Sequence, residues 1–546
     1  MVIKEVRLIL GDQLYEGHSW FEKVSPEVLY LMMEVRSETD YVFHHIQKVI
    51  AFFAAMRAFA ANLSAKGHRI LYLGLDDPRN QQSFGKNLKW VLEENPKATW
   101  AYQAPDEYRL DQLFLKLSSQ LGVPSKTVNT EHFLCEREEV KDFFVGKKQY
   151  LLESFYRHLR KQTGLLMQGS KPSGGKWNYD AENRQKYDGQ VPFPPRVKLA
   201  NQVDELLEMV QNAGVKTIGS IQNNQLDWPI DRSQSLKLLE HFCKYGLPHF
   251  GSYQDAMTEE DPFLFHSRLS FALNARILHP KEVLDRVVQE WEDRQDQISL
   301  AQVEGFVRQI LGWREYIRGI YWAEMPAYSD SNALGHKLPL PSWFWNAKTR
   351  MRCLSHSIGQ SLEYAYAHHI QRLMVTGNFA LLAGIAPAEV DQWYLGIYID
   401  AIEWAAKELD VYLAWSLHSS IPKHRSEIMP INEKYSINSL IPQLKKYYDK
   451  TKLPIFIEWI CLEENMTEEH AKELVKIMKK VPSKLNLIEF NPLANKSFKP
   501  ATKDNIDKFS KIIQDNGFLS LFRRSRGRDI NASCGSLANK KAIGNG

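Results

Sequence analysis

Short apolar runs alternate with an amphipathic stretch at the start of the chain. Residues 46–59 repeat apolar side chains at spacings of three and four, which predicts an amphipathic helix. The apolar runs on either side have the length of single strands. Because strand and helix alternate, we expect a parallel sheet covered by helices over residues 1–150. The predicted strands lie within residues 5–11, 27–34, 69–77 and 99–105.

Acidic residues follow three of these predicted strands, at Asp12, Asp76 and Asp106. Ligands of open parallel sheets bind at the carboxyl ends of the strands. The three residues therefore indicate a ligand site at one edge of the sheet. Ordinary loop or cap residues would produce the same pattern.

The composition changes twice along the rest of the chain. Residues 165–200 are rich in Gly, Pro and charge, so we interpret residues 151–201 as a linker. Residues 202–410 are helical and aromatic in pattern, with few strand signals, which predicts a mostly α domain.

After residue 410 strand and helix patterns alternate again, to the end of the chain. Ser436, Thr467 and Thr502 precede predicted helices as N-caps, and Gly517 follows the last one. Residues 411–546 are too few for a closed eight-fold barrel. We predict a partial βα barrel or a small open sheet.

Overall composition is that of a soluble globular protein, with 44% hydrophobic and 25% charged residues among 546. A chain of this length is expected to form two or three domains. No apolar run approaches the ~20 residues of a membrane span, and the N-terminus lacks the pattern of a signal peptide. We therefore expect a cytoplasmic monomer with no membrane association. The net charge of +4 restricts any nucleic-acid surface to a local patch.

Cysteine and tryptophan are the two informative residue types. The five cysteines are far apart and form no CxxC or CxxxCxxC, so neither disulfides nor a locally spaced metal cluster is predicted. Fourteen tryptophans are many for a chain of this length. They indicate either large helical cores or aromatic stacking and electron hopping around a cofactor.

Several segments of residues 1 to about 404 resemble, in family order, the iron–sulfur bacterial cryptochromes and photolyases, which include the prokaryotic (6-4) photolyases. The resemblance implies an α/β antenna-type domain followed by a helical FAD-binding domain. It also implies UV-damaged DNA as the partner. The matching segments are RLILGDQL, HSWF, MMEVRSETDYVFHHIQK, GGKWNYDAENR, FGSYQDAM, LFHSRLSFALNARILHP, EGFVRQILGWREYIRG and YAHHIQRLMVTGNFALL.

The HSRLS segment offers two hydroxyls and a guanidinium near a predicted helix start, which suits a pyrophosphate. By resemblance Ser267, Arg268 and Ser270 hold the FAD phosphates; Ser267 could equally be a plain helix cap. Resemblance also places Arg308, Trp313 and Arg314 on a helix lining the same pocket, where a surface salt-bridge ladder is the alternative. Asp400 is implied to face the flavin ring.

Two adjacent histidines, His368 and His369, interrupt a predicted apolar helix and must point to different faces. A histidine in a core is usually only satisfied by a hydrogen bond. In the family the second serves as proton donor to a (6-4) photoproduct, so this role is implied for His369. Imidazole suits the role because its ordinary pKa lies near working pH.

Three further sites are implied by the resemblance alone. Electron-transfer aromatics would reduce the flavin, although a packed aromatic cluster is the alternative. A divalent cation would lie near the lesion, and a lumazine-type antenna would bind in the first domain. The residues implied are Trp345, Trp393 and Tyr394 for electron transfer, Asp180 and Asp255 for the cation, and Gly11, Asp12 and Gln13 for the antenna.

The chain departs from this family in its cysteines. Four thiolates bind the [4Fe–4S] cluster of the family, and only the one in the MRC segment is matched, by Cys353. Cys461 is isolated within a predicted strand, and Cys534 lies far beyond. We therefore predict that the cluster is absent. The family's continuation after DAIEW, which completes the flavin and lesion pocket, is also missing, which argues against full activity.

Residues 413 to about 541 resemble the C-terminal third of the 23S rRNA adenine C2-methyltransferases, which are radical-SAM enzymes. The segments are AWSLHSS, EIMPIN, LNLIEFNPL and RRSRGRDINASCGSLANK. Ser416, His418 and Asn491 match positions around S-adenosylmethionine, and Cys534 matches the methyl carrier, where nearby arginines favour a thiolate. An unreactive tail thiol is the alternative for Cys534.

The second resemblance is also incomplete. Arg523, Arg524, Arg526 and Arg528 form a basic patch that suits RNA phosphates, or simply a solvated tail. The CxxxCxxC of radical-SAM enzymes is absent from the sequence, so we expect no methyltransferase activity.

Three hypotheses follow. The first is FAD-dependent, light-driven repair of (6-4) photoproducts in DNA, which requires the lesion to be flipped out of the stack. The second is a cryptochrome-like blue-light sensor that repairs nothing. The third is a non-functional join of two gene fragments, because the change near residues 405–412 cuts both families inside a domain and no linker separates them. Apolar surface left by the truncation would then favour aggregation.

Overall fold

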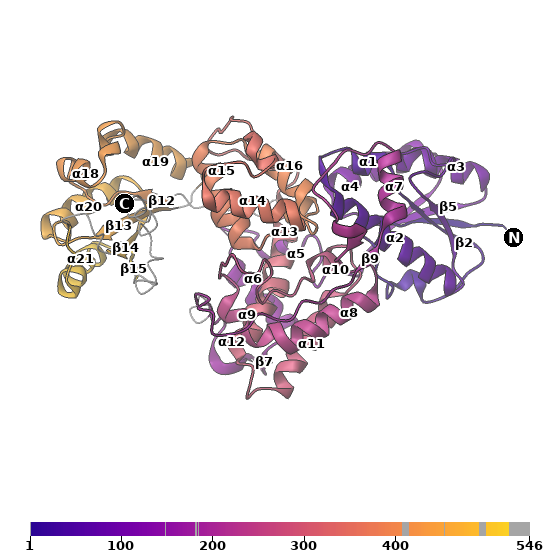
Figure 1. Ribbon diagram of the computed structural model, residues 1–546, viewed down its shortest axis with the longest axis horizontal. Helices are drawn as coiled ribbons and strands as arrows, with labels where there is room; N and C mark the ends of the chain where they lie inside the picture. The colour runs from indigo at the N-terminus through magenta and orange to yellow at the C-terminus, as the bar shows by residue number, and fades with distance from the viewer. Residues whose placement is uncertain are drawn as a thin grey trace. The chain divides into compact units, whose positions relative to one another are not determined.

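The computed structural model describes residues 2–147, 149–180, 183, 185–406, 414–451, 454–490 and 498–523. The chain divides into two compact units. Unit 1 comprises residues 1–332 and 336–409, and unit 2 comprises residues 333–335 and 410–546. Each has its own hydrophobic core, and each is described separately (Figure 1).

Unit 1 begins with the predicted parallel sheet, which is confirmed. Five strands pair in parallel in the order β4-β2-β1-β5-β6. The order changes direction at β1, so the carboxyl ends of β1 and β5 flank a topological switch point, where open α/β sheets bind ligands. Asp12 follows β1 and Asp106 follows β5. The strands are β1 (Glu5–Leu8), β2 (Val28–Met33), β4 (Arg69–Leu73), β5 (Thr99–Gln103) and β6 (Ser125–Val128).

Helices cover both faces of this sheet. The helices α3 (Phe84–Glu94) and α4 (Tyr108–Gln120) pack on one face through Leu88 and Phe114. Helix α2 (Ile46–Ala65) packs on the other face and shares a core with the helical region, as the Phe52–Phe271 ring contact at 5.1 Å shows. Two shorter elements precede α2, namely α1 (Arg36–Thr39) and β3 (His44–His45).

Helix α2 extends beyond the predicted residues 46–59 and is more apolar than expected from the sequence. By length and composition it could cross a membrane, which corrects the prediction that no run approaches that size. Within the described residues it is the one such helix, and 67% of its apolar window is buried inside the protein. Its apolar character is explained by packing against the sheet on one side and the helical region on the other.

The segment interpreted as a linker starts with a buried helix. In α6 (Leu152–Thr163), Phe155, Tyr156 and Leu159 are fully buried in the main core. Arg160 donates hydrogen bonds to the carbonyls of Trp177 (2.9 Å) and Leu166, which fastens the chain that follows. The irregular stretch therefore begins after α6, with the small β7–β8 hairpin (Met167–Gln168 and Lys171–Pro172).

The remainder of unit 1 is mostly helical, as predicted. Three π-helical segments, Phe242–Gly246, Arg308–Arg314 and Ile370–Gly377, interrupt its helices. Short strands lie at β9 (Asn201–Gln202), β10 (Thr217–Ile218) and β11 (Gln225–Leu226). The helices are α5 (Glu139–Phe143), α7 (Asp204–Asn212), α8 (Arg232–His241), α9 (Leu247–Tyr253), α10 (Ser270–Asn274), α11 (Pro280–Asp293), α12 (Leu300–Val307), α13 (Glu315–Glu324), α14 (Arg352–Tyr364), α15 (Asn378–Ala383), α16 (Pro387–Ile397) and α17 (Glu403–Ala406).

A buried charge cluster joins the sheet to the helical region. The carboxylate of Asp106 accepts hydrogen bonds from Arg276 (2.7 Å) and Arg318 (2.8 Å), and Arg137 lies 3.7 Å away. Burial acts to raise the pKa of Asp106, but the three guanidinium groups outweigh it and lower that pKa to about 2. Asp12 joins the cluster through Arg276 at 3.2 Å.

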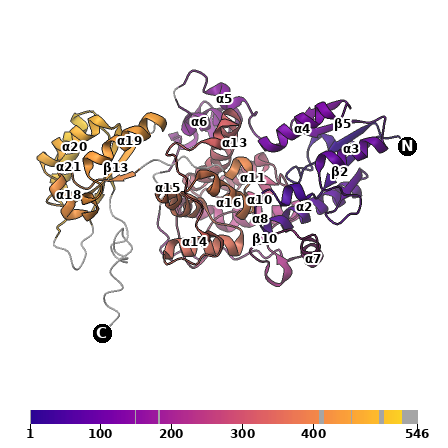
Figure 2. The same cartoon turned by 90° about the horizontal axis from the view of Figure 1, so that it is seen from above.

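Unit 2 contains a four-stranded parallel sheet in the consecutive order β12-β13-β14-β15. On β13, Ile455, Ile457 and Trp459 are buried and alternate with less buried neighbours, so helices cover one face more fully. Figure 2 shows the helices grouped around these strands. The strands are β12 (Ala414–Ser416), β13 (Ile455–Cys461), β14 (Ser483–Glu489) and β15 (Ser520–Arg523), and the helices are α18 (Pro422–Ile428), α19 (Ile437–Thr451), α20 (Glu468–Lys480) and α21 (Lys503–Asp515).

The predicted helix signals of unit 2 are confirmed. Thr467 accepts a hydrogen bond from the backbone N–H of His470, and Thr502 from that of Asn505, as N-caps do. Gly517 follows α21 with φ of +84°, a conformation that glycine adopts without strain.

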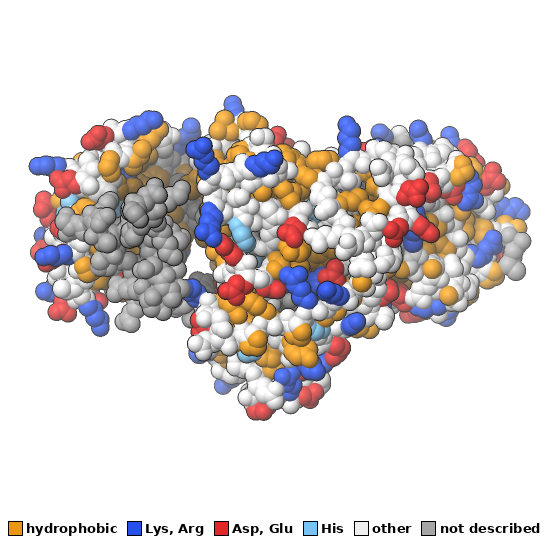
Figure 3. All heavy atoms as spheres, viewed as in Figure 1, with side chains coloured by type: hydrophobic (Ala, Val, Ile, Leu, Met, Phe, Trp, Pro, Cys, Tyr) orange, Lys and Arg blue, Asp and Glu red, His pale blue; other side chains and the backbone are white. Residues whose placement is uncertain are grey.

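Charges on the surface are mixed in sign. On the face shown in Figure 3, Lys and Arg side chains are interspersed with Asp and Glu. This agrees with the near balance of 69 basic and 65 acidic residues.

We expect Asp106→Asn to lower the free energy of unfolding by about 3–5 kcal/mol at pH 7, because buried guanidinium groups lose their counter-charge. The folded-state pKa of Asp106 lies below its ordinary value, so the stabilisation is present above about pH 4 and is lost as pH falls toward 2. Urea unfolding at pH 7 and pH 3 measures both effects.

Asp111→Asn is the matched control, because Asp111 is a partly exposed carboxylate that pairs with Arg137 at 3.0 Å. Its loss should cost less than about 1 kcal/mol. Equal stability of the two variants at pH 7 would contradict a central role for Asp106.

Candidate functional site

The HSRLS segment forms a buried turn before α10. Ser267 accepts a hydrogen bond from the N–H of Leu269 at 3.3 Å, as a local cap. Arg268 adopts φ of +58°, and its guanidinium lies over the rings of Trp228 (5.1 Å) and Phe263 (4.5 Å). Ser267 and Arg268 line a cavity of about 40 Å³.

Two polar atoms of this turn lack partners within the described part of the chain. The Ser270 hydroxyl and the Nε of Arg268 are buried without a hydrogen-bond acceptor or donor there. An unsatisfied buried polar group is costly, and both atoms are donors of the kind that bind anions. The guanidinium of Arg268 also contacts the carboxylate of Asp227, at 3.3 Å. The donor chemistry of the turn therefore fits a phosphate group.

An ion pair lies beside this turn. Arg372 donates to both carboxylate oxygens of Asp400, at 2.9 and 3.1 Å, and its guanidinium stacks 3.9 Å from the ring of Tyr398. The amide of Asn274, at the end of α10, donates to the carbonyl of Asp400 at 2.7 Å. Ser270 and Asn274 lie at the two ends of α10, so this hydrogen bond connects the helix that carries Ser270 to Asp400. Arg372 was not among the predicted site residues, although it stands four residues after His368 in the same matching segment, YAHHIQRLMVTGNFALL.

The two adjacent histidines have different surroundings, as predicted. They lie at the start of the π-helical segment rather than inside an apolar helix. His368 is buried and stacks on His266, with ring centroids 5.1 Å apart. The side chain of His369 is 44% exposed, and its Nε2 lies 3.1 Å from Asp255. Two residues expected to have separate roles, His369 and Asp255, are therefore in direct contact.

Aromatic rings connect the ion pair to the next core cluster. Tyr398 contacts Tyr394 at 5.4 Å and Trp393 at 5.7 Å, and Trp393 contacts Phe344 at 5.2 Å. Trp345, which was expected in this series, contacts Phe43 at 5.5 Å instead. Tyr398 was missed; its spacing of four from Tyr394 is the available signal.

The three residues of the predicted second pocket wall have different environments. Arg308 pairs with Asp180 at 2.9 Å. The side chain of Trp313 is 41% exposed, whereas Arg314 is buried over the ring of Phe133 at 4.3 Å. Arg314 also donates to the carbonyl of Leu273 on α10, at 3.4 Å. The three residues contact different partners, and their role in one pocket wall stays a prediction.

The two acidic residues expected to hold a cation contact different basic residues. Asp180 faces Arg308, and Asp255 faces His369. The described residues contain no group of three or more His, Cys, Asp or Glu that could hold a metal ion. Cys353 is exposed on α14, with a free thiol.

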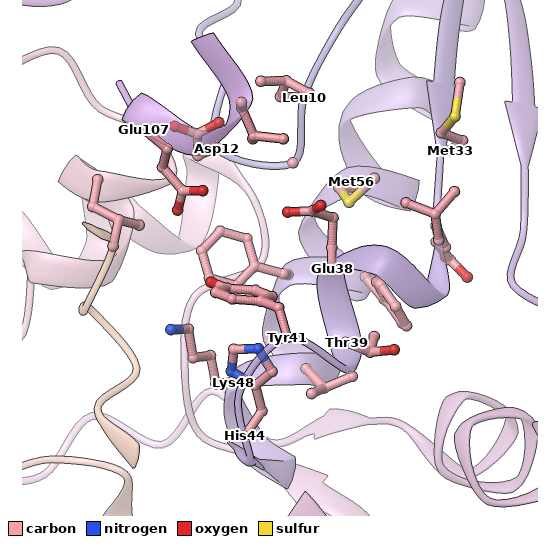
Figure 4. Close-up of a pocket in the computed structure, with 18 of the residues that line it drawn as sticks. Leu10, Asp12, Met33, Glu38, Thr39, Tyr41, His44, Lys48, Met56 and Glu107 are labelled. Atoms are coloured by element: carbon pink, nitrogen blue, oxygen red, sulfur yellow. The ribbon is translucent and has the colours of Figure 1, made fainter. Parts of the chain in front are cut away.

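A second cavity, of about 120 Å³, lies at the carboxyl ends of β1, β2 and β5 (Figure 4). It borders the switch point between β1 and β5, and we call it the switch-point cavity. Gly11 and Asp12 line it, while Gln13 is buried and hydrogen-bonds to Leu10 and Gln103. Glu38, Glu107 and His44 add polar groups, and both nitrogens of His44 are buried without partners in the described structure. Further lining residues are Met33, Thr39, Tyr41, Lys48, Phe52, Met56, Ala401 and Ile402.

Acid–base properties of this cavity are set by burial. Burial raises the pKa of Glu107 to about 7, and lowers that of His44 well below its ordinary value. Glu38 and Glu107 both pair with Arg109, at 2.6 and 2.9 Å. The cavity therefore combines a few ionisable and hydrogen-bonding groups with apolar walls, which is typical of small-molecule sites.

In unit 2, Ser416 ends β12, and His418 follows with φ of +58°. His418 Nδ1 accepts a hydrogen bond from the N–H of Ile460 at 3.1 Å, and burial lowers its pKa to about 4. Asn491, Cys534 and the arginines Arg524, Arg526 and Arg528 lie outside the described residues, as does the side chain of Arg523.

A parallel α/β sheet with a cavity at its switch point, followed by a helical region, is the architecture of the photolyase and cryptochrome class. Comparison with known proteins agrees. Residues 7–226 match the family model of deoxyribodipyrimidine photo-lyase-related proteins. A (6-4) photolyase of Agrobacterium fabrum is 38% identical over 405 residues, which cover 74% of this chain and 79% of the relative. The chain belongs to this photolyase-related family and is a homologue of the (6-4) photolyases.

Two solved structures are also similar. The crystal structure of a bacterial class III photolyase from Agrobacterium tumefaciens has a TM-score of 0.52 at 13% identity, and covers 94% of this chain and 98% of that protein. It shows that the fold is photolyase-like. A radical SAM methyltransferase from Sphaerobacter thermophilus is 31% identical over 24% of this chain and 38% of that protein, with a TM-score of 0.23.

We expect the His368 ring to stay neutral from pH 8 to pH 6. Burial lowers the pKa of His368 well below its ordinary value, and the nearby His266, His369 and Arg372 act in the same direction. In ¹³C-histidine-labelled protein, its ring resonance should keep a constant shift over this range. His368→Asn identifies the resonance by its loss, and a midpoint between pH 6 and 7 would contradict the buried, stacked position.

Proposed function

We propose that the protein is a flavin-dependent, light-driven repair enzyme for (6-4) photoproducts in UV-damaged DNA, acting as a monomer. The observation that carries the proposal is the arrangement around α10. A turn with an unsatisfied buried hydroxyl is joined by Asn274 to the Arg372–Asp400 pair. In this assignment residues 1–150 form the antenna-type domain, 202–410 the flavin-binding domain and 411–546 a methyltransferase-like remnant.

Ser267, Arg268 and Ser270 would hold the phosphates of FAD, and Asp400 would face its ring system. Reduced flavin supplies, when bound and illuminated, the electron that splits the lesion. The chain's own residues exclude water and fix charge near this site, since Arg372 and Asp400 are largely buried and pair through two hydrogen bonds. Arg308, Trp313 and Arg314 would contribute from a neighbouring segment.

His369 would deliver a proton to the flipped-out lesion. The partial exposure of His369 lets a flipped-out base of the DNA reach it, and the contact with Asp255 at 3.1 Å orients the ring. His368 cannot take this role while it stacks on His266 in the core, so we assign it to positioning the loop before Arg372.

The aromatic series Tyr398, Tyr394 and Trp393 would carry electrons toward the flavin site, with Phe344 packed beyond it. Trp345 would act at the outer end. The switch-point cavity would bind a lumazine-type antenna against Gly11 and Asp12. Cys353 matches one of the four cysteine ligands of the family's [4Fe–4S] cluster. The other three ligands are absent from the sequence, so we expect no cluster.

Unit 2 is proposed to be a remnant of a radical-SAM βα barrel. Support comes from its consecutive parallel strand order, which places successive crossover helices on one face, as in a barrel. Ser416, His418 and Asn491 would mark a former S-adenosylmethionine site, and Cys534 a former methyl carrier. Because the cluster motif is absent from the sequence, we expect no methyl transfer to rRNA. Amplification of source DNA across codons 395–420 tests whether the two fragments are joined in the genome.

The repair proposal is tested first by the visible absorption spectrum of the purified protein, where we expect flavin bands. Illumination of duplex DNA carrying one (6-4) photoproduct should then restore the two pyrimidines. A flavin-bound protein that repairs nothing would instead support the blue-light sensor. A colourless protein would overturn both.

His369→Asn should lower the yield of repair by about 10²–10⁴-fold, the usual range for loss of a proton donor, while leaving flavin absorption unchanged. His158→Asn on α6 is the matched control, since His158 pairs with Glu139 away from this site. Repair by the His369 variant within threefold of the control would exclude the proton-donor role.

A further inference from the structure

The first turn of α2 is fastened to distant parts of unit 1 through their backbone carbonyls. His45 Nε2 lies 2.8 Å from the carbonyl of Leu362, and Gln47 donates to that of Glu363 at 2.7 Å. Lys48 donates to two carbonyls at once, those of Leu395 and Ala401, both at 2.6 Å. The side chains of the N-cap His45 and of Gln47 and Lys48 in α2 therefore hold the end of α14, the last turn of α16 and the chain that follows it.

The position of Lys48 is unusual for a lysine. Lys48 is only 5% exposed to solvent, and this burial lowers the pKa of its amine to about 8. A buried ammonium group persists only with strong partners. Leu395 lies in the last turn of α16, whose carbonyls lack intrahelical partners and carry the negative end of the helix dipole. This helix end therefore suits the amine.

The turn held by Lys48 carries a residue of the candidate site. Between Leu395 and Ala401 lie Tyr398 and Asp400, which contact Arg372. The same turn is packed tightly on its other side, because a Cβ at Gly396 would lie 2.3 Å from the carbonyl oxygen of Phe43. A small shift of the turn would therefore move Asp400.

Lys48 also lines the switch-point cavity. Figure 4 shows it beside His44 and below Tyr41, on the same side of the cavity. Ala401 and Ile402, from the turn that it holds, complete the wall. One side chain thus contacts both the cavity and the segment that presents Asp400.

We propose that Lys48 is a positioning residue that couples occupancy of the switch-point cavity to the placement of the turn 395–401. A ligand in the cavity contacts the amine, or the wall that it holds, and so stabilises the turn. By thermodynamic linkage an ordered turn strengthens ligand binding by the same factor. The coupling to a flavin rests on the proposed function through Asp400, whereas the coupling between cavity and turn does not.

Amide hydrogen exchange of the full chain, stripped of any flavin, tests the coupling directly. A ribityllumazine is the probe, and its binding is followed by fluorescence. In the wild type, we expect the bound probe to slow exchange in peptides covering residues 395–404. Lys48→Met should raise the basal exchange there by about 10- to 100-fold, as expected for loss of charge-assisted hydrogen bonds, and should abolish the response to the probe.

Lys66→Met is the matched control, because it removes an amine from the other end of the same helix, where Lys66 pairs with Glu16 at 2.7 Å. It should leave both exchange and response as in the wild type. Lys48→Gln keeps N–H donors on a shorter side chain and should restore part of the protection. If Lys48→Met does not fold, this variant and the wild-type response decide the question.

Three results would overturn the proposal. They are a wild-type protein that binds no probe, bound probe without a change at residues 395–404, and equal exchange in the Lys48→Met and Lys66→Met variants. Failure of the repair proposal is seen separately, as absent flavin bands in untreated protein, and leaves the exchange comparison intact.

Discussion

The buried carboxylate of Asp106 is the interaction on which unit 1 depends. It sits at the end of a strand of the sheet, yet its partners Arg276 and Arg318 come from the helical region, 170 and 212 residues later. A buried charge without its counter-charges is strongly unfavourable, so neither region can form its inner surface alone. The sheet, the switch-point cavity and the turn around α10 are therefore parts of one structure, and the α/β and helical regions are not independent modules.

The same kind of interaction occurs at two irregular segments of unit 1. Arg160 holds the segment after α6 by its carbonyls, and Lys48 holds the turn after α16 in the same way. In each case a cation from a rigid helix satisfies carbonyls that no strand or helix would pair. Loops that carry functional side chains, such as the one that ends at Asp400, thus gain fixed positions without secondary structure of their own.

Much of the architecture could be predicted from local pattern. Short apolar runs located four of the five strands described in the first sheet, with β6 missed, and apolar periodicity located helix α2. Threonine caps located α20 and α21. Helix α6 was missed because its neighbours are rich in Gly and Pro, which masked its own amphipathic pattern. The sequence predicted an amphipathic helix at α2, but not that this helix is buried on two sides.

The site could be predicted only in part. Resemblance to a family predicted roles for Asp400 and His369, but not that Asp255 contacts His369 or that Arg372 pairs with Asp400. Such pairings join residues 28 to 114 positions apart, and local spacing carries no signal for them. Trp313 and Arg314 are adjacent in sequence but differ in exposure, because neighbouring residues of a helix point in different directions.

The partners of Lys48 also have a consequence for synthesis. They lie 347 and 353 residues downstream, so a ribosome adding about 5–20 residues per second needs roughly 20–70 s to deliver them. Throughout that interval the nascent sheet carries an amine and an apolar cavity that nothing yet covers. The N-terminal region is therefore expected to depend on chaperones until translation reaches α16, and a ribosome stalled before that point would release a chain unable to close its own first domain.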